Sequence, residues 1–295
     1  MTLLLDGGAG AAIGPDELVA TLADCAIDVR DEDAFASLAP LLGRIGRNKT
    51  FLAELAVDEL KSRCRAQSAT NGYGAQVFVL RVPGARFMVR ANFWPAATDR
   101  LTRASGAAAF FYDLPHDHNF PFLTHGYLGP GYWSDYSEYA AAGRCGVPGE
   151  AAGLRFTGRQ RLELDTIRFY RMLRDVHVQL PPDSFSVSIN ILGHDPAQPW
   201  LDQHRFDVAG DRIDAVLTTT PAESLLTLAV HLGDGIDIAD AFARSHPCDR
   251  MRVTALAALA DAAPEIAAPA VLAALESTSG YVAGHARALI GRSPP

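Results

Sequence analysis

The chain lacks the features that mark several large protein classes. It has only four cysteines, and none of them forms a CxxC pair. That pattern argues against a zinc ribbon and against a disulfide framework, and it fits a reducing cytoplasm. No stretch approaches the roughly 20 apolar residues that span a bilayer, and the N-terminus has no cationic region of the kind that opens a signal peptide. We therefore expect a cytoplasmic protein in which histidine and carboxylate hold any metal.

Basic clusters are lacking as well. The net charge is -8 and the sequence pI is about 5.6, and no Lys/Arg stripe is present, so neither nucleic acid nor a membrane is an expected partner. The 48% hydrophobic and 20% charged fractions are those of an ordinary soluble globular protein. A chain of 295 residues has room for one large domain or two modest ones.

The first 72 residues are predicted to be helical and to pack on the structure that follows. Apolar residues recur at helical spacing, and Asn48 or Thr50 is the expected N-cap of the third helix. The predicted helices cover residues 15–27, 32–45 and 48–64.

Residues 73–220 lose the helical spacing of apolar residues and are predicted to form a small β-barrel. Short β-like segments follow one another with Gly/Pro turns between them, and Pro83-Gly84 is a typical hairpin turn. This spacing favours a barrel or double-sheet roll over a parallel α/β fold, so the predicted fold class is mainly β with flanking helices. The segments are 75–82, 86–94, 111–120, 121–128, 132–139, 161–173, 175–180, 184–192, 203–210 and 212–219.

Residues 221–295 form an alanine-rich helical segment with a weak, HEAT-like repeat. The two copies, 246–261 and 271–291, each have an Ala-Ala-Leu core. Two units are fewer than the three or more that a free-standing solenoid needs. We therefore expect these helices to pack on the barrel, as a lid or as the contact of a possible homodimer.

Histidines carry the strongest chemical signal. His116 and His118 lie two apart in the segment PHDHNF, and residues two apart in a strand point to the same side. His177 lies on another predicted strand about sixty residues later. An HxH pair alone is a common accident, but a third histidine on a neighbouring strand predicts one metal ion held by three imidazoles. Such ligands suit Fe(II), Zn, Cu and Ni and leave open coordination positions.

These residues resemble the motifs of the cupin superfamily, in its cysteine dioxygenase-like, three-histidine thiol dioxygenase branch. His116, His118 and Gly126 match the first cupin motif, and His177 and Asn190 match the second. The HDH triplet, the strand VSINIL and the Trp-ending strand FMVRANFW are similar to the thiol dioxygenases. The resemblance covers roughly residues 75–195. It implies a double-stranded β-helix (jelly-roll) barrel with one Fe(II).

Two departures limit what the resemblance implies. The stretch 120–123 has no carboxylate where a typical cupin has a glutamate, which favours a site of three histidines. The catalytic Ser-His-Tyr series of thiol dioxygenases falls on Ser188, Asn190 and Leu192, so the tyrosine and the middle histidine are missing. The metal site is therefore expected here, whereas cysteine is not the expected substrate.

Other residues are predicted around the metal. Alternation places Arg90, Asn92 and Trp94 on one face of a strand. If that face points into the barrel, they bind substrate, and Arg90 clamps a carboxylate; the alternative is a solvated edge-strand arginine.

Further candidates come from the first and second motifs. His125, Tyr127 and Tyr132 are catalytic candidates, against the alternative of core or turn residues. Asp175, two residues from His177, and Asn190 are candidates for orienting the metal ligands.

The leading hypothesis is a mononuclear non-heme Fe(II) oxygenase that acts on a small polar metabolite, with a thiol or a carboxylate, and O2. Zn, Mn and Ni are alternative metals. The same residues would also suit a Zn- or Mn-dependent isomerase or lyase, or a non-enzymatic, metal-stabilised interaction module. A 2-oxoglutarate-dependent hydroxylase ranks lower, because its motif is HxD/E and no arginine lies between His177 and Arg205.

Overall fold

The computed structural model describes residues 2–74 and 76–291. The chain divides into two compact units, each with its own core. The first holds Met1–Tyr139 and Arg155–Pro196, and the second holds Ala140–Leu154 and Ala197–Pro295. The hairpin expected within the barrel, residues 203–219, thus belongs to the second unit. No described helix has the length and apolarity to cross a membrane.

The N-terminal helices begin and end where local signals place them. Asp31 accepts hydrogen bonds from the backbone N–H groups of Asp33 and Ala34, so a new helix starts there. Of the two predicted caps of the third helix, Thr50 holds the N-cap position, and the Asn48 side chain accepts from the Phe51 N–H at 3.2 Å. The predicted helix 32–45 is in fact two. The elements are α1 (Pro15–Asp24), α2 (Glu32–Ala36), α3 (Ala39–Gly46), α4 (Phe51–Lys61) and α5 (Arg65–Thr70).

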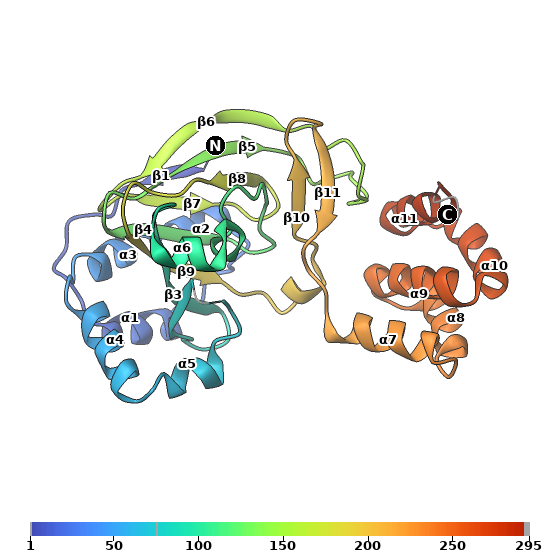
Figure 1. Ribbon diagram of the computed structural model, residues 1–295, viewed down its shortest axis with the longest axis horizontal. Coiled ribbons are helices and arrows are strands. Elements are labelled where there is room, and N and C mark those ends of the chain that lie inside the picture. The colour runs from blue at the N-terminus through green and yellow to red at the C-terminus, as the bar shows by residue number, and fades with distance from the viewer. Residues whose placement is uncertain (1, 75, 292–295) are drawn as a thin grey trace. The chain divides into compact units, whose positions relative to one another are not determined.

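Two antiparallel sheets make up the β-structure of the first unit (Figure 1). The larger has the order β1-β7-β4-β9-β3-β2 and the smaller the order β6-β5-β8. Among the described residues no strand belongs to both sheets, so the predicted closed barrel is two facing sheets. The strands are β1 (Leu3–Leu5), β2 (Val77–Arg81), β3 (Phe87–Trp94), β4 (Phe122–Leu128), β5 (Tyr132–Glu138), β6 (Arg155–Leu162), β7 (Ile167–Tyr170), β8 (Asp175–Gln179) and β9 (Ser186–Gly193). The short helices α6 (Arg100–Ser105) and η1 (Ala107–Phe110) connect β3 to the segment before β4.

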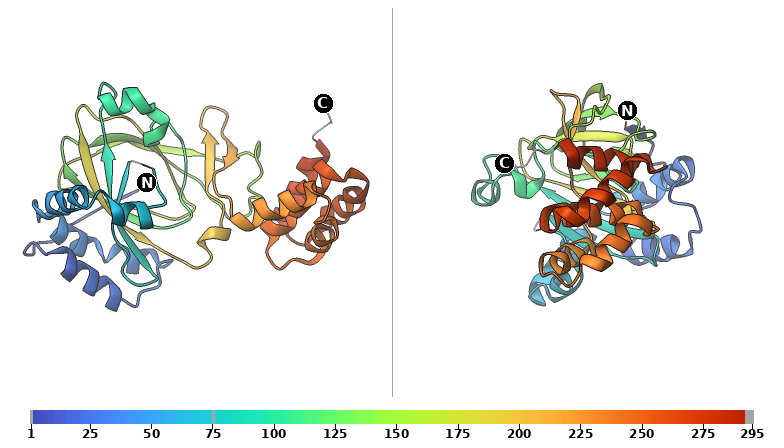
Figure 2. Two further views of the ribbon diagram at one scale, coloured as in Figure 1. Left: turned by 60° about the horizontal axis from the view of Figure 1, so that its bottom comes forward. Right: turned by 90° about the vertical axis from the view of Figure 1, so that its right-hand side faces the viewer.

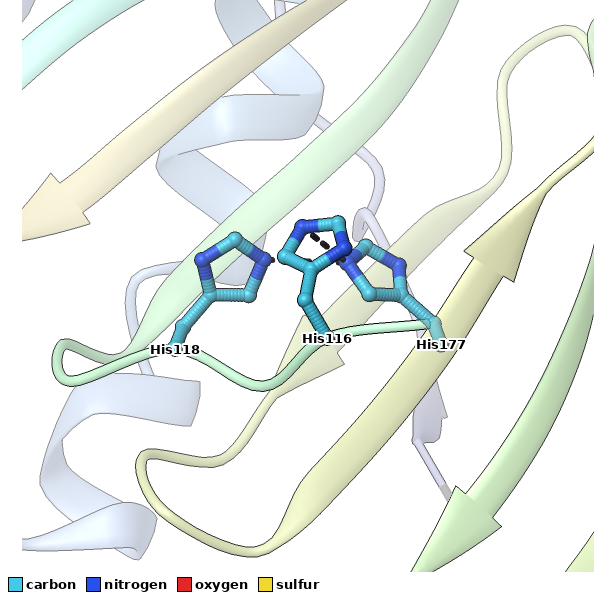
Figure 3. Close-up of side chains that lie close together, drawn as sticks. All are labelled: His116, His118 and His177. Atoms are coloured by element: carbon cyan, nitrogen blue, oxygen red, sulfur yellow. Dashed lines mark hydrogen bonds between the residues drawn. The ribbon is translucent and has the colours of Figure 1, made fainter. Parts of the chain in front are cut away.

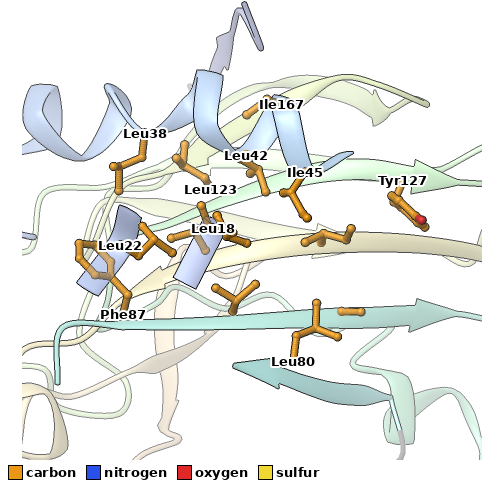
Figure 4. Packing of buried hydrophobic residues seen from close by; sticks show 14 of the residues in the cluster. Leu18, Leu22, Leu38, Leu42, Ile45, Leu80, Phe87, Leu123, Tyr127 and Ile167 are labelled. Atoms are coloured by element: carbon orange, nitrogen blue, oxygen red, sulfur yellow. The ribbon is translucent and has the colours of Figure 1, made fainter. Parts of the chain in front are cut away.

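The larger sheet has two different faces, because successive strand residues point to opposite sides. Its outer face packs on the N-terminal helices (Figure 4). Phe35, Leu42 and Ile45 of the helices are fully buried there against strand residues such as Leu123 and Ile189. Each such side chain contributes about 1.5–3 kcal/mol of transfer free energy.

The inner face of the larger sheet points toward the smaller sheet. Phe122, Tyr170 and Leu192 pack with Tyr136 of β5. Trp94 packs on Tyr132 with ring centroids 4.2 Å apart. These cross-sheet contacts define the space in which the histidines lie.

The second unit joins a hairpin to five helices, which gather into one bundle (Figure 2). The bundle buries alanines and leucines such as Ala255, Leu256 and Leu259 against one another. Its helices therefore supply their own core, which two repeats were not expected to do. The elements are η2 (Gln198–Trp200), β10 (His204–Asp207), β11 (Arg212–Val216), α7 (Pro221–His231), α8 (Ile236–Ser245), α9 (Asp249–Ala262), α10 (Pro264–Leu275) and α11 (Gly280–Gly291).

Candidate metal centre

Three imidazole rings converge in the interior of the first unit (Figure 3). The Nε2 atom of His177 lies 3.0 Å from that of His118 and 3.3 Å from that of His116. Ligand nitrogens about 2.1 Å from one ion are about 3.0–3.4 Å apart for angles between square and tetrahedral. A single shared proton satisfies only one pair of nitrogens, whereas one metal ion satisfies all three. The three residues thus fit a metal ion, as predicted.

The backbone that holds His116 and His118 differs from the prediction. Residues 111–120 are not a strand; His116 forms only an isolated bridge to His177. The two residues exchange backbone N–H···O hydrogen bonds of 3.1 and 3.0 Å, and the Leu173 N–H donates to the His118 carbonyl at 2.8 Å. Pro115 has no N–H and cannot extend the ladder. These bonds anchor the HxH segment so that both rings point to the same side.

Hydrogen bonds at the far ring nitrogen orient two of the ligands. The Nδ1–H of His116 donates to the Leu114 carbonyl at 2.8 Å, which leaves its Nε2 lone pair for a metal. The side-chain amide nitrogen of Gln179 lies 3.0 Å from Nδ1 and 3.3 Å from Nε2 of His177. Turning that amide to present Oε1, which has no other hydrogen-bond partner in the described chain, lets it accept the Nδ1–H and frees His177 Nε2.

Asp175 does not have the orienting role predicted for it. Its carboxylate accepts hydrogen bonds from the backbone N–H and the Nε of Arg171, at 2.8 and 3.0 Å. Arg171 is four residues away across the turn that precedes β8, so the ion pair closes that turn. Gln179, two residues on the other side of His177, takes the position expected for Asp175. Sequence reasoning missed it although the same two-residue spacing identifies it.

Burial keeps the three rings neutral, which is the form that binds metals. Desolvation lowers the pKa of His116 and places those of His118 and His177 well below the usual range. Neighbouring imidazoles and the charge of Arg90 lower the pKa of His118 further. The site therefore loses no affinity to ring protonation near neutral pH.

Aromatic side chains enclose the centre. The ring of Phe122 lies 4.7 Å from that of His118, and the ring of Tyr170 lies 4.7 Å from that of His177. The hydroxyls of Tyr136 and Tyr170 are 2.9 Å apart. Burial raises the pKa of both phenols, so they remain protonated. Neither tyrosine was predicted, although both occupy inward positions of their strands.

Arg90, Asn92 and Trp94 lie on the inner face of β3, so Arg90 is not the solvated edge-strand arginine of the alternative interpretation. Arg90 is opposite Asn190, and Asn92 is opposite Ser188. The Trp94 N–H donates to the Ser188 hydroxyl at 3.0 Å. The indole N–H is the only polar group of the Trp94 side chain, so Trp94 has none left for a ligand and serves as apolar lining of the site. Arg90 and Asn92 each retain a polar atom without a partner in the described chain.

His125 and Tyr127 face away from the metal centre, which corrects their prediction as catalytic residues. β4 presents Phe122 inward, so its odd-numbered residues face the helices. The His125 ring packs against Gly46 of α3, and the Tyr127 hydroxyl donates to the Asn48 carbonyl at 2.8 Å. Tyr132 does face inward, and burial raises its pKa.

Asn190 lies on the inner face as well, but its register partner is Arg90 and not a metal ligand. Its Oδ1 is buried and has no hydrogen-bond partner among the described residues. The orienting role predicted for it is thus carried by Leu114 and Gln179.

Comparison with known proteins yields distant matches only. No protein-family model matches the chain, and no curated protein matches it. Among solved structures, DMSP lyases RdDddP and RnDddQII match at 11% identity and a TM-score of 0.23 over 41% of this chain. DMSP lyase DddQ from Ruegeria pomeroyi matches at 11% and 0.24 over 66% of this chain and 79% of its own.

A third match is RmlC from Streptococcus suis, at 10% identity and a TM-score of 0.22 over 47% of this chain and 81% of its own. The chain spans only 44% of the first matched structure. None of the three is named as a thiol dioxygenase. At these TM-scores the matches assign neither a family nor an activity to this chain, and its chemistry rests on the centre itself.

Proposed function

We propose that this protein is a mononuclear metal enzyme of cupin type that binds one Fe(II) through His116, His118 and His177 and oxidises a small polar metabolite with O2. The observation that carries the proposal is the convergence of three Nε2 atoms within 3.0–3.3 Å in two pairs. The two facing antiparallel sheets support a cupin fold. When bound, iron on three neutral ligands offers open positions for substrate and O2 and the electrons that oxygen chemistry needs.

The chain's own residues would prepare this site in three ways. Leu114 and Gln179 fix the rings of His116 and His177. Phe122 and Tyr170 pack on the rings of His118 and His177 and limit the access of water to them. Tyr136 and Tyr170 stay protonated, and the hydrogen bond between their hydroxyls leaves one hydroxyl hydrogen to donate toward a bound molecule.

A second candidate is a Lewis-acid lyase or isomerase that uses Zn or Mn. The hydroxyl pair of Tyr136 and Tyr170 favours it, because a lyase or isomerase must move a proton and the Tyr170 ring packs on the His177 ring. A 2-oxoglutarate-dependent hydroxylase is less well supported, since no carboxylate joins the histidine cluster in the described part of the chain.

Elemental analysis of protein purified without chelator, together with an oxygen electrode, tests the proposal. We expect about one iron per chain and O2 uptake with small thiols or carboxylates. His177→Ala should abolish iron binding and O2 uptake while the protein stays folded, and His194→Ala, which alters a histidine outside the cluster, should leave both unchanged. Bound zinc with turnover that is insensitive to anaerobiosis would favour the second candidate. Loss of the fold in His177→Ala would instead indicate a structural metal in a non-enzymatic module.

A further inference from the structure

A row of polar side chains crosses the inner face of the larger sheet beside the metal centre. The register places Arg90 of β3 opposite Asn190 of β9 and Asn190 opposite Thr124 of β4. The adjacent row contains Phe122 and Leu192, and the His118 ring lies on Phe122. Two residues along a strand are about 7 Å, so the polar row is one step from the metal ligands.

Arg90 is a buried cation without a carboxylate partner. Its side chain is only 8% exposed, and no described residue forms an ion pair with it. The guanidinium lies over the Tyr73 ring at 4.9 Å, and its Nε has no hydrogen-bond partner. Leaving a guanidinium buried and unpaired costs free energy that an anion would offset.

Two amide oxygens beside Arg90 are also unsatisfied. The Oδ1 atoms of Asn92 and Asn190 are buried and have no hydrogen-bond partner in the described chain. Asn92 follows Arg90 by two residues on the same face, and Asn190 is directly opposite Arg90. Native proteins rarely leave such groups unpaired unless a ligand, water or ion completes them. Here the Nε–H donor of the Arg90 cation lies near two neutral acceptors, the Oδ1 atoms of Asn92 and Asn190.

Another buried arginine of the same sheet pairs both of its terminal guanidinium nitrogens. Arg168 lies at the other end of the row, opposite Thr124. Its guanidinium donates to the Gln160 side chain at 2.5 Å and to the Arg161 carbonyl at 3.2 Å. Arg168 therefore links the two sheets, although its Nε, like that of Arg90, has no partner in the described chain. Arg90 instead meets the Tyr73 side chain and no amide or carboxylate acceptor among the described residues.

From this arrangement we propose that Arg90, Asn92 and Asn190 form a subsite for a small hydroxy- or amino-carboxylate. The inference rests on the proposed function in that the bound molecule is the substrate of the metal centre. The planar carboxylate pairs with the guanidinium, and the hydroxyl or ammonium group donates to the amide oxygens. A single guanidinium among neutral side chains fits one carboxylate better than a phosphate. The short step to His118 limits the substrate to a small molecule that reaches both sites.

Isothermal titration calorimetry with matched probes tests the subsite. Lactate and L-serine carry both a carboxylate and a donor, propionate lacks the donor, and lactamide lacks the charge. We expect lactate or L-serine to bind at least about tenfold more tightly than propionate or lactamide. The titration is run on the protein as purified and again after loading with Mn(II), since the row lies beside the metal ligands and not among them.

Three variants locate the binding. Arg90→Gln should weaken binding of the better carboxylate about 10- to 100-fold. Asn190→Asp, which keeps the shape and places a carboxylate opposite Arg90, should abolish binding and raise the thermal midpoint. Arg168→Lys, the matched control, should change affinity less than threefold, a threshold well below the tenfold expected for one lost charged hydrogen bond.

Several results would overturn the subsite. These are equal binding of lactamide and lactate, unchanged affinity in folded Arg90→Gln or Asn190→Asp, and absence of binding by every probe at about 10 mM, a concentration that detects even weak complexes. If Arg90-dependent binding is present but the protein takes up no metal, the subsite stands and the proposed function fails. If the protein binds a metal but none of the carboxylate probes, the subsite fails and the proposed metal centre stands.

Discussion

The two faces of the larger sheet are built from the same strands but differ in how their polar groups are satisfied. On the outer face, the Tyr127 hydroxyl donates to a backbone carbonyl of the N-terminal region, and the His125 ring packs on Gly46 with its Nδ1 unpartnered in the described chain. On the inner face, Arg90, Asn92 and Asn190 each keep a buried atom without a partner, and three histidines meet. Most of the unpartnered polar atoms of this sheet in the described chain thus lie on its inner face, where a ligand would satisfy them.

The largest expected effect is on the outer face. Phe35 of α2 is fully buried and stacks on Phe169 with ring centroids 5.7 Å apart. Phe35→Ala removes that contact and leaves a cavity, so we expect the free energy of unfolding to fall by about 3–5 kcal/mol. Urea unfolding of the metal-loaded protein measures this. A loss below 1 kcal/mol, after allowing for the usual error of the extrapolation, would show that the helices contribute little to the fold.

His125 gives the outer face a pH dependence. Burial lowers its pKa to about 4, against about 6.5 in the unfolded chain. Between these values the unfolded state binds a proton that the folded state does not, so stability falls as the pH falls from 6.5 to 4. The whole effect is at most about 3 kcal/mol. His125→Gln should remove this part of the acid sensitivity in urea unfolding at several pH values, while parallel curves for both proteins would contradict the assignment.

Gln179 tests whether the inner face is organised for a metal. Gln179→Leu removes the group that holds the His177 ring, and we expect metal affinity to fall about 10- to 100-fold with little change in stability. Gln179→Glu keeps an acceptor for the Nδ1–H and should retain affinity within about threefold of the native protein on the same scale. Competition with a chelator of known affinity measures both. Equal affinity in all three proteins would mean that the amide does not orient the ligand.

The smallest effect is expected at Trp94, whose side chain lines the inner face without a free polar group. Trp94→Phe loses the hydrogen bond to Ser188 and some ring contact with Tyr132. The expected loss is about 1 kcal/mol of stability, measured by urea unfolding. Affinity for lactate should stay unchanged, and a weakened affinity would place Trp94 in the subsite after all.

Strand alternation predicted a good part of the site. The shared face of Arg90, Asn92 and Trp94 follows from a period of two, whereas the period does not show which way that face points. The shared direction of His116 and His118 was predicted from the same period, but backbone bonds to His177 and Leu173 hold these residues outside any strand. Alternation alone could not show which residues of β4 point inward, because six of its seven residues are buried and neither face is mainly polar. His125 and Tyr127 were therefore predicted on the wrong face.

Long-range contacts account for the other differences. Asp175 pairs with Arg171 across a turn that hydrophobic patterns do not reveal. The hairpin of β10 and β11 was recognised as a hairpin, but its place in the second unit depends on contacts distant in sequence. The division into two sheets depends on which strands pair by backbone hydrogen bonds. The sequence of a short strand does not determine its partner.

X-ray absorption at the metal edge of protein purified without chelator tests the metal centre most directly. The convergence of His116, His118 and His177 predicts three imidazole nitrogens at about 2.1 Å around one ion per chain, and the loss of this signal in His118→Ala. A spectrum with oxygen or sulfur ligands only, or one that His118→Ala leaves unchanged, would contradict the account.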